Sequence, residues 1–281
     1  MAKANIKIGV GGIGLNPISG YSGGGKIILP GVADYYSSCL NHKMSLAENP
    51  RYGEVNHPTR KEMDEVVEMI GLDMIVNVLL NSNGVITDIF VGHPVEAYEN
   101  GVKTYQKQNE PLKEVKKADL TLMVQTSPTK PEIVPAYPPN FFSAMDAIIK
   151  AGMLTNEDGF IILDYECLSG FFHKNCPSCK VCQAYILNAA KSKSSTDVLQ
   201  MVSREKIHGW IGPLIYWMSK VKEKIRRFVW VNSLIDKDLK KMNYDVEKNV
   251  SKALTKILRD NKKITVNIAT HNIPLTSKIR L

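Results

Sequence analysis

The stretch IKIGVGGIGLNPISGYSGGGK, which spans Ile6–Lys26, joins an apolar strand pattern to a glycine-rich loop. Its first part, Ile6–Gly12, predicts a buried strand. The glycines after it predict a loop that continues to about Ile28, because glycine permits backbone conformations that other residues disfavour. In open α/β sheets, ligands bind at the loops that leave the carboxyl ends of the strands. This stretch therefore indicates both a fold class and the place where a site is expected.

The loop ends in a lysine, which is its chemically distinctive feature. Gly20, Gly25 and Lys26 satisfy the G-x-x-x-x-G-K part of a phosphate-binding loop. The next residue is Ile27, not the Ser or Thr that binds magnesium, so the pattern argues against a nucleoside triphosphatase. Glycines let backbone N–H groups approach an anion, and a lysine adds a charge or a nucleophilic amine. The loop predicts a phosphorylated ligand or a covalent attachment, unless it is a plain turn with a surface lysine.

Apolar strands alternate with amphipathic helices along the rest of the chain. This rhythm predicts an α/β fold with mostly parallel sheets flanked by helices. In one helix, Thr59 and Glu62 predict a capping box at the start and Gly71 predicts the end. Asn83-Gly84 predicts a tight hairpin turn. The expected helices cover 33–46, 59–71, 94–108, 140–153 and 247–260, and the expected strands cover 6–12, the two arms of 73–92, 118–125, 159–165, 226–232 and 263–269.

A charged segment with one proline, NEPLKEVKKAD (109–119), separates two halves of this pattern. Such segments are typical of domain boundaries. We therefore expect two domains, 1–110 and 111–270, followed by a tail, 271–281, that returns to the first domain.

The composition is that of an ordinary globular protein. Of 281 residues, 44% are hydrophobic and 23% are charged, which supports a sizeable core. The net charge of +8 gathers in the last third of the chain. No aromatic-interleaved recognition motif accompanies this charge, so the pattern indicates a solvated, lysine-rich surface and argues against nucleic acid as a partner.

The sequence carries no signal for a membrane or for secretion. The best apolar run, WIGPLIYW (Trp210–Trp217), is too short to cross a bilayer and contains Pro213. The N-terminus MAKANIKIGV lacks the apolar core of a signal peptide. We expect a cytoplasmic protein.

Three of the five cysteines are clustered in HKNCPSCKVC. Thiolates at this spacing on a loop can converge on one metal ion or cluster. An iron–sulfur cluster would take its fourth ligand from Cys167, Cys39 or a partner, whereas zinc would be held by three thiolates and a histidine. Free thiols at the start of a helix are the remaining interpretation. The candidate ligands are His173, Cys176, Cys179 and Cys182.

The segments GYSGGGKIILPGVADYYSSCLNH (20–42) and HPTRKEMDEVVEMIGLDMIVNVLLNSNGVITDIFVG (57–92) resemble the nickel-dependent lactate racemase family. Members of this family racemise or epimerise 2-hydroxy acids by passing a hydride to a nickel-pincer mononucleotide. The resemblance implies that Lys26 is joined to this nucleotide through a thioamide and that His42 ligates the nickel. It also implies that the loop receives the cofactor phosphate, with Ser22, Gly23, Gly24 and Gly25 as cofactor-binding residues.

This sequence also departs from the family at several positions. Where the family has a catalytic histidine, this sequence has Asn16, which can orient a substrate but cannot act as a base at neutral pH. The second histidine and an arginine belong to an upstream segment that this sequence does not contain. Three explanations follow: the segment is a separate subunit, the chain binds cofactor or metal without racemising anything, or the chain is a truncated product. An incomplete first domain would expose strand edges and apolar surface, so we expect a protein partner or a homo-oligomer to complete it. The resemblance places Lys130 at the position of a family lysine that contacts the substrate, and the alternative is an ordinary loop lysine beside two prolines.

Two functions follow as hypotheses. The first is a racemase-type or epimerase-type isomerase component that acts on a 2-hydroxy acid. The alternative is a non-racemising subunit on the same fold, with an iron–sulfur cluster or zinc at the cysteines.

Overall fold

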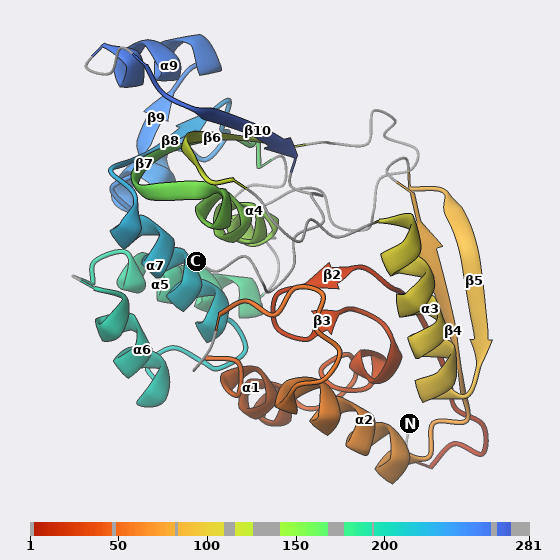
Figure 1. The fold of residues 1–281 in the computed structure, drawn as a ribbon. Coiled ribbons are helices and arrows are strands. Elements are labelled where there is room, and N and C mark those ends of the chain that lie inside the picture. Colours follow the sequence, from red (N-terminus) through yellow and green to blue (C-terminus); the bar gives the residue numbers. More distant parts are fainter. Residues whose placement is uncertain are drawn as a thin grey trace. The chain divides into compact units, whose positions relative to one another are not determined.

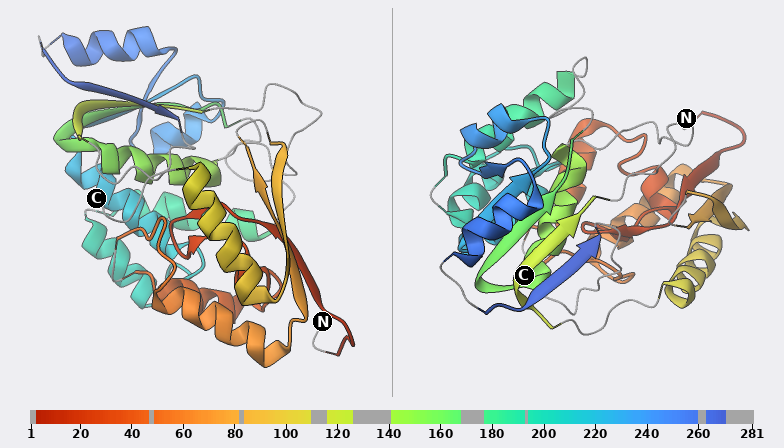
Figure 2. Two further views of the ribbon diagram at one scale, coloured as in Figure 1. Left: turned by 45° about the vertical axis from the view of Figure 1, so that its right-hand side comes forward. Right: turned by 90° about the horizontal axis from the view of Figure 1, so that it is seen from above.

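The computed structural model describes residues 3–46, 49–81, 84–109, 116–125, 141–167, 177–192, 194–259 and 263–270, with only the backbone at 142 and 177–179. The chain forms two compact units. The first contains the described residues up to 109 together with 208–213, and the second contains those of 116–207 and 214–270. Figures 1 and 2 show the elements of both units.

The first unit is built on a three-stranded sheet. Strands β1 (Ile8–Gly12), β4 (Met74–Leu80) and β5 (Ile86–Gly92) lie in the order β1-β4-β5. β1 and β4 are parallel, and β4 and β5 form an antiparallel pair. The predicted first strand and the predicted pair of strands within 73–92 are both present, although Asn83 of the predicted turn lies outside the described residues. The prediction that the first strand is buried is wrong for its apolar side chains: Ile8 and Val10 are 52% and 72% exposed, because Gly9 and Gly11 are the residues that face Ile27 and the core.

Three helices belong to this unit: α1 (Tyr35–Lys43), α2 (Pro58–Ile70) and α3 (Pro94–Gln108). The apolar faces of α2 and α3, residues of the glycine loop and one face of the sheet form the core. This core contains Ile13, Tyr21, Ile28, Val67, Leu72, Ile75, Leu79, Ala97, Tyr98 and Val102.

The start of α2 differs from the prediction. His57 is the N-cap residue and makes no capping bond with its side chain, while Pro58 occupies the first turn. Thr59 therefore lies inside the helix, and the predicted capping box of Thr59 and Glu62 is wrong. Proline is favoured at this position because the first helical N–H needs no intrahelical acceptor. Gly71 ends the helix as predicted, with φ at 66°.

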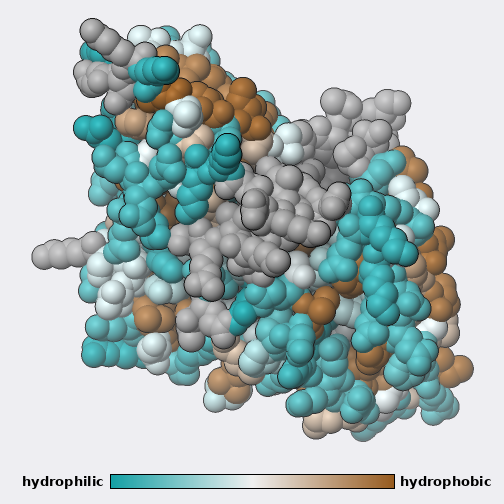
Figure 3. Space-filling model, viewed as in Figure 1, coloured by the Kyte–Doolittle hydropathy of each residue, from teal (hydrophilic) through white to brown (hydrophobic). Residues whose placement is uncertain are grey.

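The other face of this sheet carries apolar side chains that the described residues leave exposed. Val10 is 72% exposed, Ile89 60% and Val91 58%. The strand register aligns Val10 with Val76 and Val76 with Val91, so these side chains share one face. Figure 3 shows hydrophobic residues gathered along the side of the first unit where β5 lies. We call Ile8, Val10, Leu80, Ile86, Ile89 and Val91 the outer face.

The second unit contains a five-stranded sheet in which every pairing is parallel. The strand order is β10-β6-β7-β8-β9. The strands are β6 (Ala118–Val124), β7 (Thr155–Asp164), β8 (Arg227–Val231), β9 (Asp245–Glu247) and β10 (Val266–Thr270). The alternation of strands and helices thus gives the predicted parallel α/β sheet. The two-domain α/β fold class is confirmed, with one antiparallel pair in the first unit.

Helices pack beside this sheet, and some of them were not predicted. The apolar run at Trp210–Trp217, which is too short to cross a bilayer, belongs partly to a helix. The helices are α4 (Phe141–Leu154), α5 (Pro177–Ala189), α6 (Ser195–Ser203), α7 (Gly212–Lys224), α8 (Asp236–Lys241) and α9 (Val250–Leu258). In the described part of the chain, none of the helices has both the length and the apolar character needed to cross a membrane.

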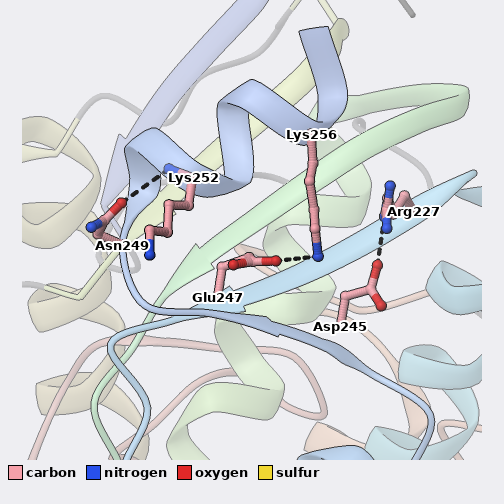
Figure 4. A network of polar contacts seen from close by, with 6 residues as sticks. All are labelled: Arg227, Asp245, Glu247, Asn249, Lys252 and Lys256. Carbon is pink, nitrogen blue, oxygen red and sulfur yellow. Dashed lines mark hydrogen bonds and ion pairs between the residues drawn. The ribbon is translucent and has the colours of Figure 1, made fainter. Parts of the chain in front are cut away.

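Polar contacts tie the edge of this sheet to α9 (Figure 4). Arg227 Nε donates to Asp245 Oδ2 across the β8–β9 pair at 2.5 Å. Lys256 on α9 forms an ion pair with Glu247 on β9. Asn249 caps α9 by accepting a hydrogen bond from the N–H of Lys252. These bonds hold the short strand β9 at the edge of the sheet.

The outer face makes a stability prediction. Replacing both Val10 and Ile89 with Lys should change the free energy of unfolding of the isolated chain by less than about 1 kcal/mol, because neither side chain is buried. The variant should also bind less of a fluorescent hydrophobic dye. Thermal unfolding and dye fluorescence measure the two effects.

Leu79→Lys on the opposite face of β4 is the control, because Leu79 is 1% exposed and its replacement should unfold the domain. A large loss of stability in the double variant as well would show that the outer face is covered in solution.

Candidate functional site

The glycine loop follows β1 and turns back on itself. After Gly12 the chain forms a small hairpin, β2 (Leu15–Asn16) and β3 (Gly20–Tyr21), and then a 3₁₀ turn, η1 (Gly24–Ile27). The predicted position of the loop at the carboxyl end of the first strand is therefore confirmed.

Close packing explains why the loop needs glycine. Gly24 has φ at 56°, and a Cβ built there would lie 2.8 Å from Cγ of Tyr98. At Gly23, with φ at 82°, a Cβ would lie 2.7 Å from the side-chain oxygen of Asn77. The Asn77 oxygen accepts a hydrogen bond from the N–H of Gly24 at 2.9 Å. The loop is thus held against β4 and α3 at a distance that only glycine allows.

Ser22, predicted among the cofactor-binding residues, closes the base of the loop. Its hydroxyl lies 2.9 Å from the carbonyl oxygen of Gly12, to which it can donate. Its N–H donates to the carbonyl of Gly14 at 2.8 Å.

Lys26 lies in η1, and its amine points into the loop. Nζ donates to Oγ of Ser19 at 3.1 Å. Loss of solvent around the amine, followed by the positive charge of Arg60, lowers the pKa of Lys26 to about 7. At neutral pH a substantial fraction of this amine is therefore uncharged and nucleophilic.

Asn16 is linked to Lys26 through Ser19. Its side-chain oxygen accepts hydrogen bonds from the N–H groups of Ile18 and Ser19 at 3.0 and 2.9 Å. Oγ of Ser19 lies 3.0 Å from the same oxygen. The Asn16 oxygen therefore shapes the turn, and only its amide nitrogen remains to contact another group.

His42 lies on α1 and is 4% exposed. Burial, followed by the nearby charge of Lys26, lowers the pKa of His42 to about 3. The imidazole is therefore neutral at physiological pH, which is the form that binds metals. Its Nδ1 atom has no hydrogen-bond partner among the described residues.

Several residues that the sequence did not single out surround the loop. Arg60 is 1% exposed and donates to loop carbonyl groups. Asn77 and Tyr98 contact the glycines. Asn41, next to His42, donates to the carbonyl of Thr59 at 3.1 Å. The HPTR pattern gave only a helix start, so no local signal in the sequence marked Arg60 as buried.

Unpaired polar atoms gather at this loop. Among the described residues, eight buried side-chain nitrogen or oxygen atoms lack a hydrogen-bond partner, and six of them belong to the first unit. Buried polar atoms without partners are costly, so such a cluster is typical of a site that binds a polar group. The six are on Asn41, His42, His57, Arg60, Asn77 and Tyr98.

The imidazole of His42 and the amine of Lys26 fit the nickel-pincer cofactor that the resemblance implies. A neutral imidazole suits a transition metal such as nickel, and an uncharged amine suits covalent attachment. The glycines pack the loop against Asn77 and Tyr98, and binding of the cofactor phosphate at this loop stays a prediction.

Most of the cysteine cluster lies outside the described residues. This holds for His173, Cys176 and the side chain of Cys179, and Lys130 is outside as well. Cys182 is buried on α5, which begins at Pro177. The predicted loop geometry is thus wrong for Cys179 and Cys182, because proline begins a helix here. Within the described ranges, no group of three or more His, Cys, Asp or Glu side chains could hold a metal ion.

Known proteins resemble this chain in sequence. The family model "Lactate racemase N-terminal domain" matches residues 1–53. A lactate racemase of Thermoanaerobacterium thermosaccharolyticum is 32% identical over 102 residues, which are 35% of this chain and 24% of that protein. A lactate racemase of Lactiplantibacillus plantarum is 24% identical over 268 residues, covering 91% of this chain and 57% of the relative. The chain thus spans about half of the second relative and less of the first.

Solved structures share the fold. The lactate racemase apoprotein of T. thermosaccharolyticum superimposes with a TM-score of 0.78 at 20% identity, covering 98% of this chain and 63% of that one. A Thermotoga maritima protein gives a TM-score of 0.59 at 13% identity, with 95% and 67% covered. The resemblance predicted from the sequence is confirmed.

The environment of Lys26 predicts an unusual dependence of its acetylation rate on pH. Acetylation by acetic anhydride requires the uncharged amine, so its rate at Lys26 should rise to a plateau with a midpoint near pH 7. Peptide mass spectrometry over a pH series measures this rate, with the exposed Lys61 on α2 as the reference site. A rate that still rises steeply near pH 10, where an ordinary lysine titrates at about 10.4, would contradict the lowered pKa.

Proposed function

Because this chain is related to the lactate racemases in sequence and shares their fold, we propose that it is a racemase-type or epimerase-type component acting on a 2-hydroxy acid. One observation carries the proposal: the loop holds the largely desolvated Lys26 amine near a buried, neutral imidazole, His42. The cytoplasmic location and the second-domain assignment of 111–270 remain predictions.

In this proposal, Lys26 is the attachment point of a nickel-pincer mononucleotide, and His42 is a nickel ligand. When bound, this group supplies the acceptor for the C2 hydride of the substrate. The chain's own residues prepare the site. Burial keeps the amine nucleophilic and the imidazole neutral, and the glycine loop is where the phosphate of the nucleotide would bind.

Asn16 is proposed to orient the substrate. Its oxygen already accepts hydrogen bonds from the turn, so its amide nitrogen is the group that would donate to the hydroxyl or carboxylate of a hydroxy acid. An amide cannot accept the hydroxyl proton, so the base must come from elsewhere. Lys130 remains a predicted substrate contact outside the described residues.

The proposal predicts a covalent modification. Chain produced together with cofactor-maturation enzymes should carry an added mononucleotide, which intact mass spectrometry detects and peptide mapping places at Lys26. Lys26→Ala should remove the added mass, while Lys61→Ala, on the surface of α2, should retain it. His42→Ala should keep the added mass but lose nickel in metal analysis. A native mass equal to that of the bare chain would overturn the proposal.

We also propose that further polypeptide completes the first unit, equivalent to the part of the lactate racemases that this chain does not match. Two observations support this. The chain covers only 63% of the lactate racemase apoprotein, and the outer face exposes large apolar side chains next to the edge strand β1. Exposed apolar faces beside unpaired strand edges are typical of interaction surfaces.

Co-expression tests this second proposal. The chain and the unmatched part of the L. plantarum lactate racemase should elute together as a one-to-one complex, measured by size exclusion with light scattering. The double replacement of Val10 and Ile89 by Lys should abolish the complex. A dimer of this chain alone, lost in the same variant, would favour a homo-oligomer instead, and a monomer under both conditions would contradict both.

A further inference from the structure

Arg60 is a buried cation that the proposed function leaves without a role. It lies in the first turn of α2 and is 1% exposed. Nη1 donates to the carbonyl of Gly23 at 3.2 Å. Nη2 donates to the carbonyl of Tyr21 and lies 3.5 Å from that of Ser19. All three carbonyl groups belong to the glycine loop.

The charge of Arg60 has no ion-pair partner among the described residues, and its Nε atom has no hydrogen-bond partner there. The guanidinium carbon lies 4.5 Å from the ring centre of Tyr98, a cation–π contact. Burial raises the pKa of the Asp64 carboxyl, and this effect is larger than the lowering that the charge of Arg60 causes. A buried cation without a paired carboxylate is costly, so its retention calls for a role.

The same loop residues contact both Arg60 and Lys26. The Gly23 carbonyl accepts a hydrogen bond from Arg60 and a second one from the N–H of Lys26 at 3.3 Å. Ser19 faces Arg60 with its carbonyl oxygen and accepts from the Lys26 amine with its hydroxyl. A change in the position of the guanidinium therefore moves both anchors of Lys26.

We propose that Arg60 is a positioning residue for Lys26: its guanidinium fork holds the carbonyl groups of the loop so that the amine is presented at the attachment site. The role of Lys26 as the attachment point rests on the proposed function. The contact itself does not, because it exists in the chain alone.

The fork and the charge of Arg60 can be separated by substitution. Arg60→Lys keeps a positive charge but loses the planar fork, whereas Arg60→Met loses both. Arg51→Lys is the matched control. Arg51 lies close to the same loop, since its N–H donates to the carbonyl of Pro17, and its side chain pairs with Glu54 near the surface at 2.6 Å.

Hydrogen exchange of residues 19–26 and the pH profile of Lys26 acetylation are both measured on the chain without cofactor. In Arg60→Lys, amide exchange of the loop should rise at least about tenfold, which corresponds to about 1.4 kcal/mol and to the loss of a charged hydrogen bond. Exchange in β4 and α3 should stay as in the parent chain. The midpoint of Lys26 acetylation should remain close to that of the parent.

Arg60→Met should show the same loosened loop and, in addition, a shift of the Lys26 midpoint to higher pH, because the charge that lowers the pKa of Lys26 is gone. A purely structural arginine would raise exchange throughout the unit, in β4 and α3 as well as in the loop. The proposal is overturned if loop exchange in Arg60→Lys equals that in Arg51→Lys. If Arg60→Met fails to fold, the Arg60→Lys comparison alone decides.

A final measurement separates this inference from the proposed function. With maturation enzymes present, Arg60→Lys should carry at least about tenfold less attached nucleotide than Arg51→Lys. If the parent chain carries none, the proposed function fails while the exchange data still test Arg60. If the parent carries it and Arg60→Lys carries as much, the positioning role fails.

Discussion

The site depends on one electrostatic constraint: Lys26 of the glycine loop is largely desolvated, and the buried guanidinium of Arg60 lies close to it. Lys26 and Arg60 repel each other, and each has lost solvent. The unit tolerates this because backbone carbonyl groups receive the guanidinium and because the amine can give up its proton near neutral pH. The same two conditions make Lys26 a nucleophile. The loss of solvent and the nearby positive charge that destabilise the charged form of Lys26 are therefore also what make its amine nucleophilic.

The second constraint in the first unit is the exposed apolar face of its sheet. Strands β1, β4 and β5 bury one face against helices. On that face, Asn77 of β4 accepts a hydrogen bond from the loop. The outer face has the same apolar character but no cover among the described residues. A sheet with two apolar faces is suited to burial on both sides. Asn77, which contacts the loop, and the outer face lie on opposite sides of the same strands.

Local sequence predicted most elements because their signals are local. Pro94 and the apolar spacing after it gave the bounds of α3, and Gly71 gave the end of α2 through its left-handed backbone. The start of α2 was misplaced because Thr59 and Glu62 match a capping box, whereas the loop expected around Cys179 has a different cause. A proline that reads as a breaker within a sequence also serves as the first residue of a helix. The residues around Lys26 escaped notice because Arg60, Asn77 and Tyr98 are far from it in sequence.

The sequence by itself determined the α/β class, the glycine loop after the first strand, the lysine at its end and the resemblance to the lactate racemases. Periodicity, turn residues and motif spacing are properties of neighbouring residues, so they can be read without a structure. Only the tertiary structure decided that Lys26 and His42 are largely desolvated, that Arg60 binds the loop, and that one sheet face has no cover among the described residues. Burial and charge proximity arise from packing between distant segments, and no local pattern encodes them.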